Sequence, residues 1–137
     1  MVKPIKQQLC LLINLKKMKD ENVIQKKSYS FALRIIKLYQ FLSKKNEFVL
    51  SKQILRSGTS IGANVEEAIG SQSRKEFYSK MCLVYKEARE TEYWLRLLRD
   101  SNLLSESQST SMIKDCHEIL RITGSIQKTL KAKSSNS

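Results

Sequence analysis

The feature that most constrains the fold is a regular series of mostly apolar residues between Phe77 and Leu98. The spacing between them alternates between four and three positions, through Phe77, Met81, Val84, Ala88, Thr91, Leu95 and Leu98. This is the heptad pattern of a helix that packs along the seam of a left-handed bundle. Ser73 and Glu76 form a capping box that marks its start. The sequence therefore predicts a long helix over residues 74–100.

Three further segments carry helical apolar spacing and are joined by short connections. Asn46 is the expected N-cap of a second helix with Glu47 in its first turn, and Ser105 with Gln108 forms a capping box before the last one. The chain has one proline and four glycines, and no sustained alternation of the kind that half-buried strands show. We predict an all-α, up-down-up-down antiparallel four-helix bundle over residues 21–131, with helices at about 28–45, 47–69, 74–100 and 106–131.

Both ends of the chain are expected to lie outside this bundle. Residues 1–20 read as a basic extension, and Met18 is an alternative start that would omit residues 1–17. The apolar run from Leu9 to Leu15 is too short to span a bilayer, which needs about 20 residues, and no signal-peptide cleavage site follows it. Binding of residues 9–17 to a membrane surface is a weaker option, and no membrane partner is expected. Residues 132–137 are predicted to be a disordered tail.

The distribution of charge is more informative than its total of +12. Residues 1–27 carry +5 and residues 121–137 carry +4, whereas the long middle segment carries +3. Cationic ends on a nearly neutral domain indicate attraction to a polyanion, either nucleic acid or an acidic membrane surface. The alternative is that the charge serves solubility alone. The three cysteines have no paired spacing, so we expect reduced thiols and a cytoplasmic location.

Catalytic and metal-binding chemistry have little support in the sequence. His117 is the one histidine, and no Glu-x-x-His motif of a bundle metal pair occurs. No glycine-rich phosphate loop is present, and no nucleophile has a plausible base beside it. We expect no enzyme activity, no metal and no cofactor.

Small and polar residues occupy an unusual block between Ile54 and Phe77. Its members within two helical turns are Ser57, Gly58, Thr59, Ser60, Gly62 and Ala63. Glycine inside a helix costs about 0.5–1 kcal/mol relative to alanine. Close backbone contact with another helix would compensate, and we expect such a contact here.

A polar stripe runs along the same helix, through Arg56, Ser60, Asn64 and Glu67. On the following helix, Glu87 and Glu90 lie in an otherwise apolar stripe. We predict a buried network in which Arg56 pairs with both glutamates and fixes helix register, with Ser60 and Asn64 adding hydrogen bonds. The alternative is a polar face exposed to solvent.

These residues resemble a known family. The segments are SYSFALRIIKLYQFL, FVLSKQILRSGTSIGANVEEAIGSQSRKEFYSKM and KEARETEYWLRLL, and the likeness to the 23S rRNA intervening-sequence proteins covers about residues 20 to 130. The resemblance implies a bundle that assembles into a cyclic homopentamer with a basic surface or channel and without known catalysis. More distantly, the chain is similar to accessory variability proteins of diversity-generating retroelements, which implies binding to structured RNA.

The function predicted from these observations is that of a homo-oligomeric scaffold that binds RNA or DNA phosphates. The candidate contacts are Lys44, Lys45, Arg74, Lys75, Arg96, Arg99, Lys128, Lys131 and Lys133. The alternative is an adaptor that recruits another protein and whose charge is incidental. Clustering of Tyr78 and Tyr85 outside the core would favour that alternative, because aromatic residues concentrate at interfaces.

Overall fold

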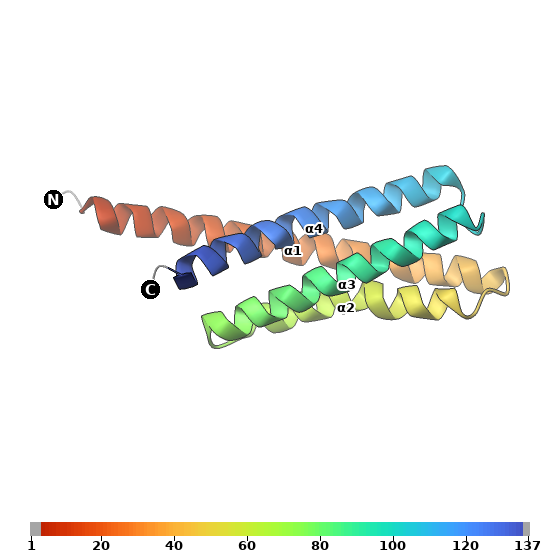
Figure 1. Ribbon diagram of the computed structural model, residues 1–137, viewed down its shortest axis with the longest axis horizontal. Coiled ribbons are helices and arrows are strands. Elements are labelled where there is room, and N and C mark those ends of the chain that lie inside the picture. The colour runs from red at the N-terminus through yellow and green to blue at the C-terminus, as the bar shows by residue number, and fades with distance from the viewer. Residues whose placement is uncertain (1–3, 136–137) are drawn as a thin grey trace.

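A computed structural model describes residues 4–135, and these residues are helical apart from three short connections. The helices are α1 (Ile5–Lys44), α2 (Leu50–Ile69), α3 (Arg74–Asp100) and α4 (Glu106–Ser135). Consecutive helices run in opposite directions and both chain ends lie at the same end of the bundle (Figure 1). Each helix packs on the next, and α4 returns to α1. The all-α class is therefore confirmed.

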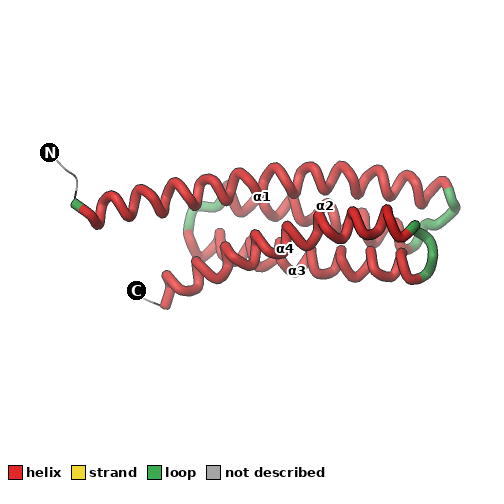
Figure 2. The backbone as a smooth tube through the Cα atoms, turned by 90° about the horizontal axis from the view of Figure 1, so that it is seen from above, coloured by secondary structure: helices red, strands yellow, loops and turns green. Residues whose placement is uncertain are grey.

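The helix bounds correct two predictions about the chain ends. The range of α3 coincides with the predicted 74–100. In contrast, α1 begins at Ile5 instead of residue 28, so the predicted extension is largely helical and projects past the other helices (Figure 2). The leucines, lysines and glutamines after Pro4 are good helix formers, and no glycine or proline interrupts them. Similarly, α4 continues to Ser135, so residues 132–135 are not a disordered tail. Residues 1–3 and 136–137 lie outside the described part.

The start of α2 also differs from the prediction. Asn46 is not its N-cap, because its φ of 63° places it in the left-handed region just past the end of α1. The carboxylate of Glu47 caps α2 instead. It accepts hydrogen bonds from the backbone N–H groups of Val49, Leu50 and Ser51, at 3.1, 2.9 and 2.7 Å. These bonds occupy amides that have no partner inside the helix, so α2 begins at Leu50.

The starts of α3 and α4 use the side chains that the sequence indicated. Ser73 Oγ accepts a hydrogen bond from the Glu76 amide at 3.1 Å. Before α4 the exchange is reciprocal, because Ser105 Oγ accepts from the Gln108 amide at 3.2 Å and Gln108 Oε1 accepts from the Ser105 amide at 3.4 Å. The Ser73 cap and the Ser105–Gln108 capping box therefore mark where these helices begin, although Glu76 Oε2 accepts from the Gln72 amide at 3.3 Å and not from that of Ser73.

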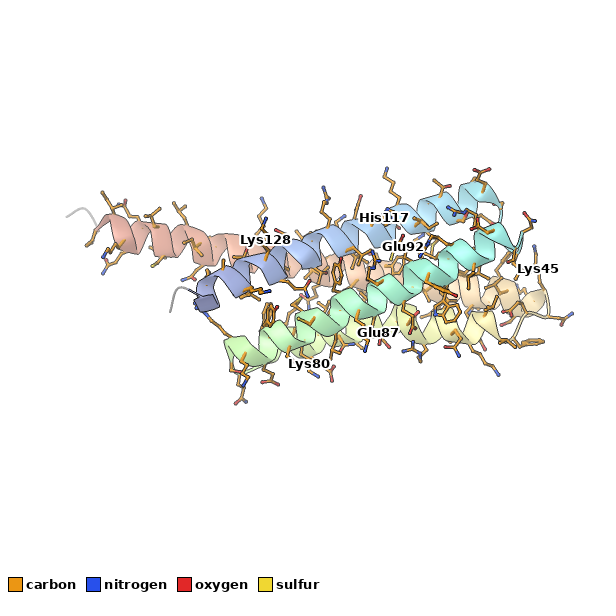
Figure 3. The ribbon with its side chains drawn as sticks, in the orientation of Figure 1. Lys45, Lys80, Glu87, Glu92, His117 and Lys128 are labelled. Atoms are coloured by element: carbon orange, nitrogen blue, oxygen red, sulfur yellow. The ribbon has the colours of Figure 1, made fainter. Side chains whose placement is uncertain are left out.

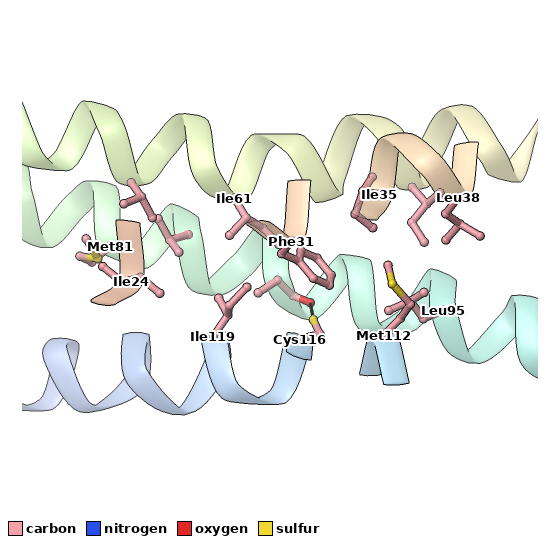
Figure 4. Close-up of a cluster of buried hydrophobic side chains, with 14 of the residues drawn as sticks. Ile24, Phe31, Ile35, Leu38, Ile61, Met81, Leu95, Met112, Cys116 and Ile119 are labelled. Carbon is pink, nitrogen blue, oxygen red and sulfur yellow. Dashed lines mark hydrogen bonds between the residues drawn. The ribbon is translucent and has the colours of Figure 1, made fainter. Parts of the chain in front are cut away.

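The predicted seam of α3 forms the centre of the core. All seven of its residues are buried. Apolar side chains from the other helices surround them (Figure 4), with the largest fully buried ones including Ile24, Phe31, Ile35, Leu42, Ile54, Ile61 and Ile119. Burial of one such side chain contributes about 1.5–3 kcal/mol, so this seam determines how the helices pair.

Gly58 marks the close approach between α1 and α2 that its small-residue block predicts. A Cβ atom at Gly58 would lie 2.7 Å from Cγ1 of Ile35, which is itself fully buried. Gly62 differs, because a Cβ atom there would lie 3.5 Å from the Ser28 carbonyl oxygen, an ordinary contact distance. The requirement for glycine is therefore specific to position 58.

A matched pair of substitutions tests this contact. Gly58→Ala should lower the free energy of unfolding by about 1–3 kcal/mol, because the fully buried Ile35 side chain would have to shift within the core. Gly62→Ala should leave stability unchanged or raise it by up to about 1 kcal/mol through helix propensity. Urea denaturation followed by circular dichroism measures both. Equal effects of the two substitutions would contradict close packing at Gly58.

The cap of α2 predicts a dependence of stability on pH. Partial burial acts to raise the pKa of Glu47, but the backbone hydrogen bonds outweigh it and hold that pKa below its usual value. A lowered folded-state pKa stabilises the fold above the unfolded pKa of about 4.3, and the contribution is lost as the pH falls through the folded value.

Glu47→Gln should therefore lower the free energy of unfolding at pH 7 by about 1 kcal/mol, as loss of a helix cap does. The difference from wild type should shrink progressively below about pH 4, where Glu47 itself becomes protonated. Thermal melts at a series of pH values measure both effects. A difference that stays constant down to pH 2 would show that the charge of the cap does not contribute.

Candidate functional site

Ion pairs between α2 and α3 join the residues that the sequence singled out. Arg56 Nη1 lies 3.3 Å from Glu87 Oε2, and Arg56 Nη2 binds Glu90 Oε2. Trp94 Nε1 donates to the same Glu90 oxygen at 3.3 Å. The side chains are 49%, 21% and 40% exposed for Arg56, Glu87 and Glu90. The predicted pairing is present, but the prediction that it is buried is wrong, because the pairs lie at the outer edge of the α2–α3 contact.

The remaining members of the predicted network do not join it. Ser60 Oγ donates to the Arg56 carbonyl oxygen at 2.6 Å, and Asn64 Nδ2 donates to the Ser60 carbonyl oxygen at 2.8 Å. Both side chains are thus satisfied one turn back on their own helix, as short polar side chains often are. Glu67 forms a separate ion pair with Lys80, whose Nζ lies 3.5 Å from Glu67 Oε2. Lys80 is labelled in Figure 3. The contacts are local and do not form one continuous network.

A buried hydroxyl pair lies deeper in the same contact and was not predicted. The hydroxyl oxygens of Ser57 and Thr91 are fully buried and 2.9 Å apart, and Thr91 Oγ1 lies 2.8 Å from the Glu87 carbonyl oxygen. Because that carbonyl can only accept, Thr91 donates to it and accepts from Ser57. The sequence signal for this pair was Thr91, the one polar residue in the otherwise apolar seam of α3.

Ion pairs between α1 and α4 were also not predicted. Lys27 Nζ lies 2.7 Å from Glu118 Oε2, and Arg34 Nη1 binds Asp115. The hydrogen bond and charge of Lys27 hold the pKa of Glu118 below its usual value. The cations are seven residues apart on α1 and thus share a face. The sequence could not reveal which helix that face would meet.

His117 and Cys116, two side chains of types often used in catalysis, are engaged in structural contacts. His117 Nε2 lies 3.1 Å from Glu92 Oε1, and Arg96 Nε lies 3.8 Å from the same oxygen (Figure 3). Burial raises the pKa of the Cys116 thiol to about 12, so it stays protonated at neutral pH. Within residues 4–135, no group of three histidine, cysteine, aspartate or glutamate residues could hold a metal ion.

The candidate phosphate contacts form two groups at opposite ends of the bundle. Lys44 and Lys45 end α1 at the same end at which α3 carries Arg96 and Arg99 (Figure 1). The start of α3 and the last turns of α4 lie at the other end, which places there Arg74, Lys75, Lys128, Lys131 and Lys133. The structure therefore does not unite the nine residues in one surface.

The first of these groups is partly neutralised by acidic residues. Arg99 Nε lies 2.8 Å from Asp100 Oδ1, and this hydrogen bond raises the pKa of Arg99 and lowers that of Asp100. An open hollow beside the α3–α4 connection is lined by both residues together with Lys45 and Glu106. Charges of both signs share this end, which weakens it as a phosphate site.

The contact between Arg56 and Glu90 gives a testable energy. A double-mutant cycle with Arg56→Met and Glu90→Gln should return a coupling of about 0.5–1 kcal/mol, the range of exposed pairs with good geometry. The coupling should fall at 1 M salt, where charges are screened within about 3 Å. Urea denaturation measures the four variants. A coupling of 3 kcal/mol that does not depend on salt would instead indicate a buried pair.

Comparisons with known proteins place the chain among related sequences. The model of the family of 23S rRNA-intervening sequence proteins matches residues 20–125. A solved structure of a protein of unknown function from the S23 ribosomal protein family, from Bacteroides thetaiotaomicron, is 50% identical to the chain. The match covers 80% of this chain and 98% of that one, with a TM-score of 0.78. No curated protein matches.

Proposed function

Because the chain belongs to the family of 23S rRNA-intervening sequence proteins, we propose that it is a non-enzymatic, homo-oligomeric four-helix-bundle scaffold that binds structured RNA or DNA. The observation that carries the proposal is the net charge of +12 together with the way acidic side chains are used. Among the described residues, seven acidic side chains are bound to cationic ones: Glu67, Glu87, Glu90, Glu92, Asp100, Asp115 and Glu118. The surplus of lysine and arginine remains at exposed positions, where it can contact phosphates.

The state of the nucleophilic groups supports a role without catalysis. His117 is occupied by Glu92, and the protonated Cys116 is buried against the Ala88 carbonyl oxygen at 3.2 Å. All three cysteines are free, and they are exposed, partly buried and buried, respectively. Free thiols are typical of a reducing compartment, so we propose that the protein is cytoplasmic. Among the described helices, none has an apolar stretch long enough to cross a bilayer.

Exposed apolar side chains on α1 support self-association, for which we propose a cyclic homopentamer. Tyr29, Leu33 and Ile36 are spaced by four and three positions and are 66%, 47% and 39% exposed. This spacing places them along one outer face of α1. Contiguous apolar surface of this kind is typical of contacts between protein chains. A ring would repeat each basic surface around its axis and strengthen phosphate binding.

Two measurements test the proposal. Fluorescence anisotropy with a labelled RNA stem should show binding at low salt, with log affinity falling linearly against log salt concentration. Light scattering should give the mass of five chains of 15.9 kDa each. Absence of binding at 20 mM salt would contradict the nucleic-acid function. A monomer mass would contradict the ring.

The alternative function is a protein-interaction adaptor, which is favoured by exposed aromatic residues. Phe48 and Tyr93 are 50% and 45% exposed, and aromatic residues are enriched at interfaces. Tyr78 and Tyr85, which could have added support, are only partly exposed. A purified partner that stays bound after nuclease treatment would favour the adaptor over the nucleic-acid scaffold.

A further inference from the structure

Basic residues form an exposed row on α4. Lys114, Arg121 and Lys128 are exposed and recur every seven residues, which places them in one row along the helix. At 1.5 Å per residue the row is about 21 Å long. This row was only partly recognised in the sequence, where Lys128 alone was considered as a phosphate contact.

The two acidic residues in the middle of α4 lie beside this row, on the side that faces α1. Asp115 and Glu118 face α1, where they bind Arg34 and Lys27. Lys114 and Arg121 are close enough to contribute weakly to the lowered pKa of Glu118, after the larger effect of Lys27. The central acids of α4 are therefore already paired with cations of another helix, and the outward row is left with excess positive charge.

The neighbouring face of α3 is also basic. Glu92 is the acid at this contact, but its side chain is only 15% exposed and is held by His117 and Arg96. Arg89 lies seven residues before Arg96, so the two share a face of α3, and Arg89 is exposed. The α2–α3 side is different, because Glu87 and Glu90 neutralise Arg56 there.

We propose that the outer α3–α4 surface, formed by Lys114, Arg121, Lys128 and Arg89, binds the phosphate backbone of a double-helical nucleic acid. This inference rests on the proposed nucleic-acid function and assigns it to one surface. A straight, rigid row of cations is complementary to the regular line of phosphates along a duplex.

The composition of α4 favours a duplex over a single strand. Proteins that hold single strands combine cations with aromatic side chains on which the bases stack. The sequence of α4 contains no phenylalanine, tyrosine or tryptophan. Within α4 the row therefore offers phosphate contacts without a stacking side chain, and the aromatic residues nearest to it, Tyr85 and Tyr93, belong to α3.

The test compares two variants of the full chain that lose the same charge. In the first, Lys114→Gln, Arg121→Gln and Lys128→Gln remove the row. In the control, Lys19→Gln, Lys26→Gln and Lys52→Gln remove three exposed cations from α1 and α2. Anisotropy is measured from 20 to 200 mM salt with an RNA stem, a DNA duplex of the same sequence and an unstructured RNA strand.

The row variant should lower the slope of log affinity against log salt by about 2–3 for a duplex, since each lost phosphate contact removes about 0.9. The control should change that slope by less than about 1. The two duplexes distinguish RNA from DNA as the source of the phosphates. Equal losses in both variants, or tighter binding of the unstructured strand, would overturn the assignment.

The outcomes separate this inference from the proposed function. If wild type binds a duplex and the row variant keeps its full slope, the surface is wrong while nucleic-acid binding stands. If wild type binds none of the three probes at 20 mM salt, both are wrong. Circular dichroism melts check that each variant is folded. If the triple variant is unstable, the single substitution Arg121→Gln replaces it, with an expected slope change of about 1.

Discussion

The apolar seam of α3 is the contact on which the rest of the bundle depends. Its seven buried residues meet α2 on one side and α4 on the other. Ser57 pairs with Thr91 at this seam, and an unpaired hydroxyl at that depth would cost about 1–3 kcal/mol. Apolar packing therefore provides the free energy, while the hydroxyl pair disfavours other registers of α2 against α3. Once this register is set, every polar side chain on the flanks has a fixed neighbour.

The close approach of α1 to α2 completes the core from the other side. Gly58 admits the Ile35 side chain against its backbone, and the free energy that glycine costs the helix is offset by this packing. The same approach brings Gln25 within hydrogen-bond distance of Glu66, at 3.0 Å. Close packing in the core thus decides which surface groups meet, although the surface contacts themselves are worth little.

Much of the fold could be predicted from the sequence because its signals are local. The seam and the capping boxes at Ser73 and Ser105 depend on spacings of three and four residues within one helix. The start of α1 could not be predicted, because helix propensity without an amphipathic face gives no clear boundary. At the candidate site, Arg56 was correctly paired with Glu87 and Glu90 from adjoining helices. The exposure of Arg56 and the ion pairs between α1 and α4 depend on how each helix is rotated about its own axis. Residue spacing within one helix does not specify that rotation.

Helix rotation also connects the fold to the proposed function. Residues of one helix turn together, so the placement of Asp115 and Glu118 relative to Lys114, Arg121 and Lys128 does not depend on how α4 is rotated. The rotation decides instead which helix these acids meet, and it turns them toward α1, where they bind Arg34 and Lys27. Each such pair contributes little to stability, since both partners are a third or more exposed. Its larger consequence is electrostatic, because cations of α1 bind the acids beside the outer row and leave that row with excess positive charge.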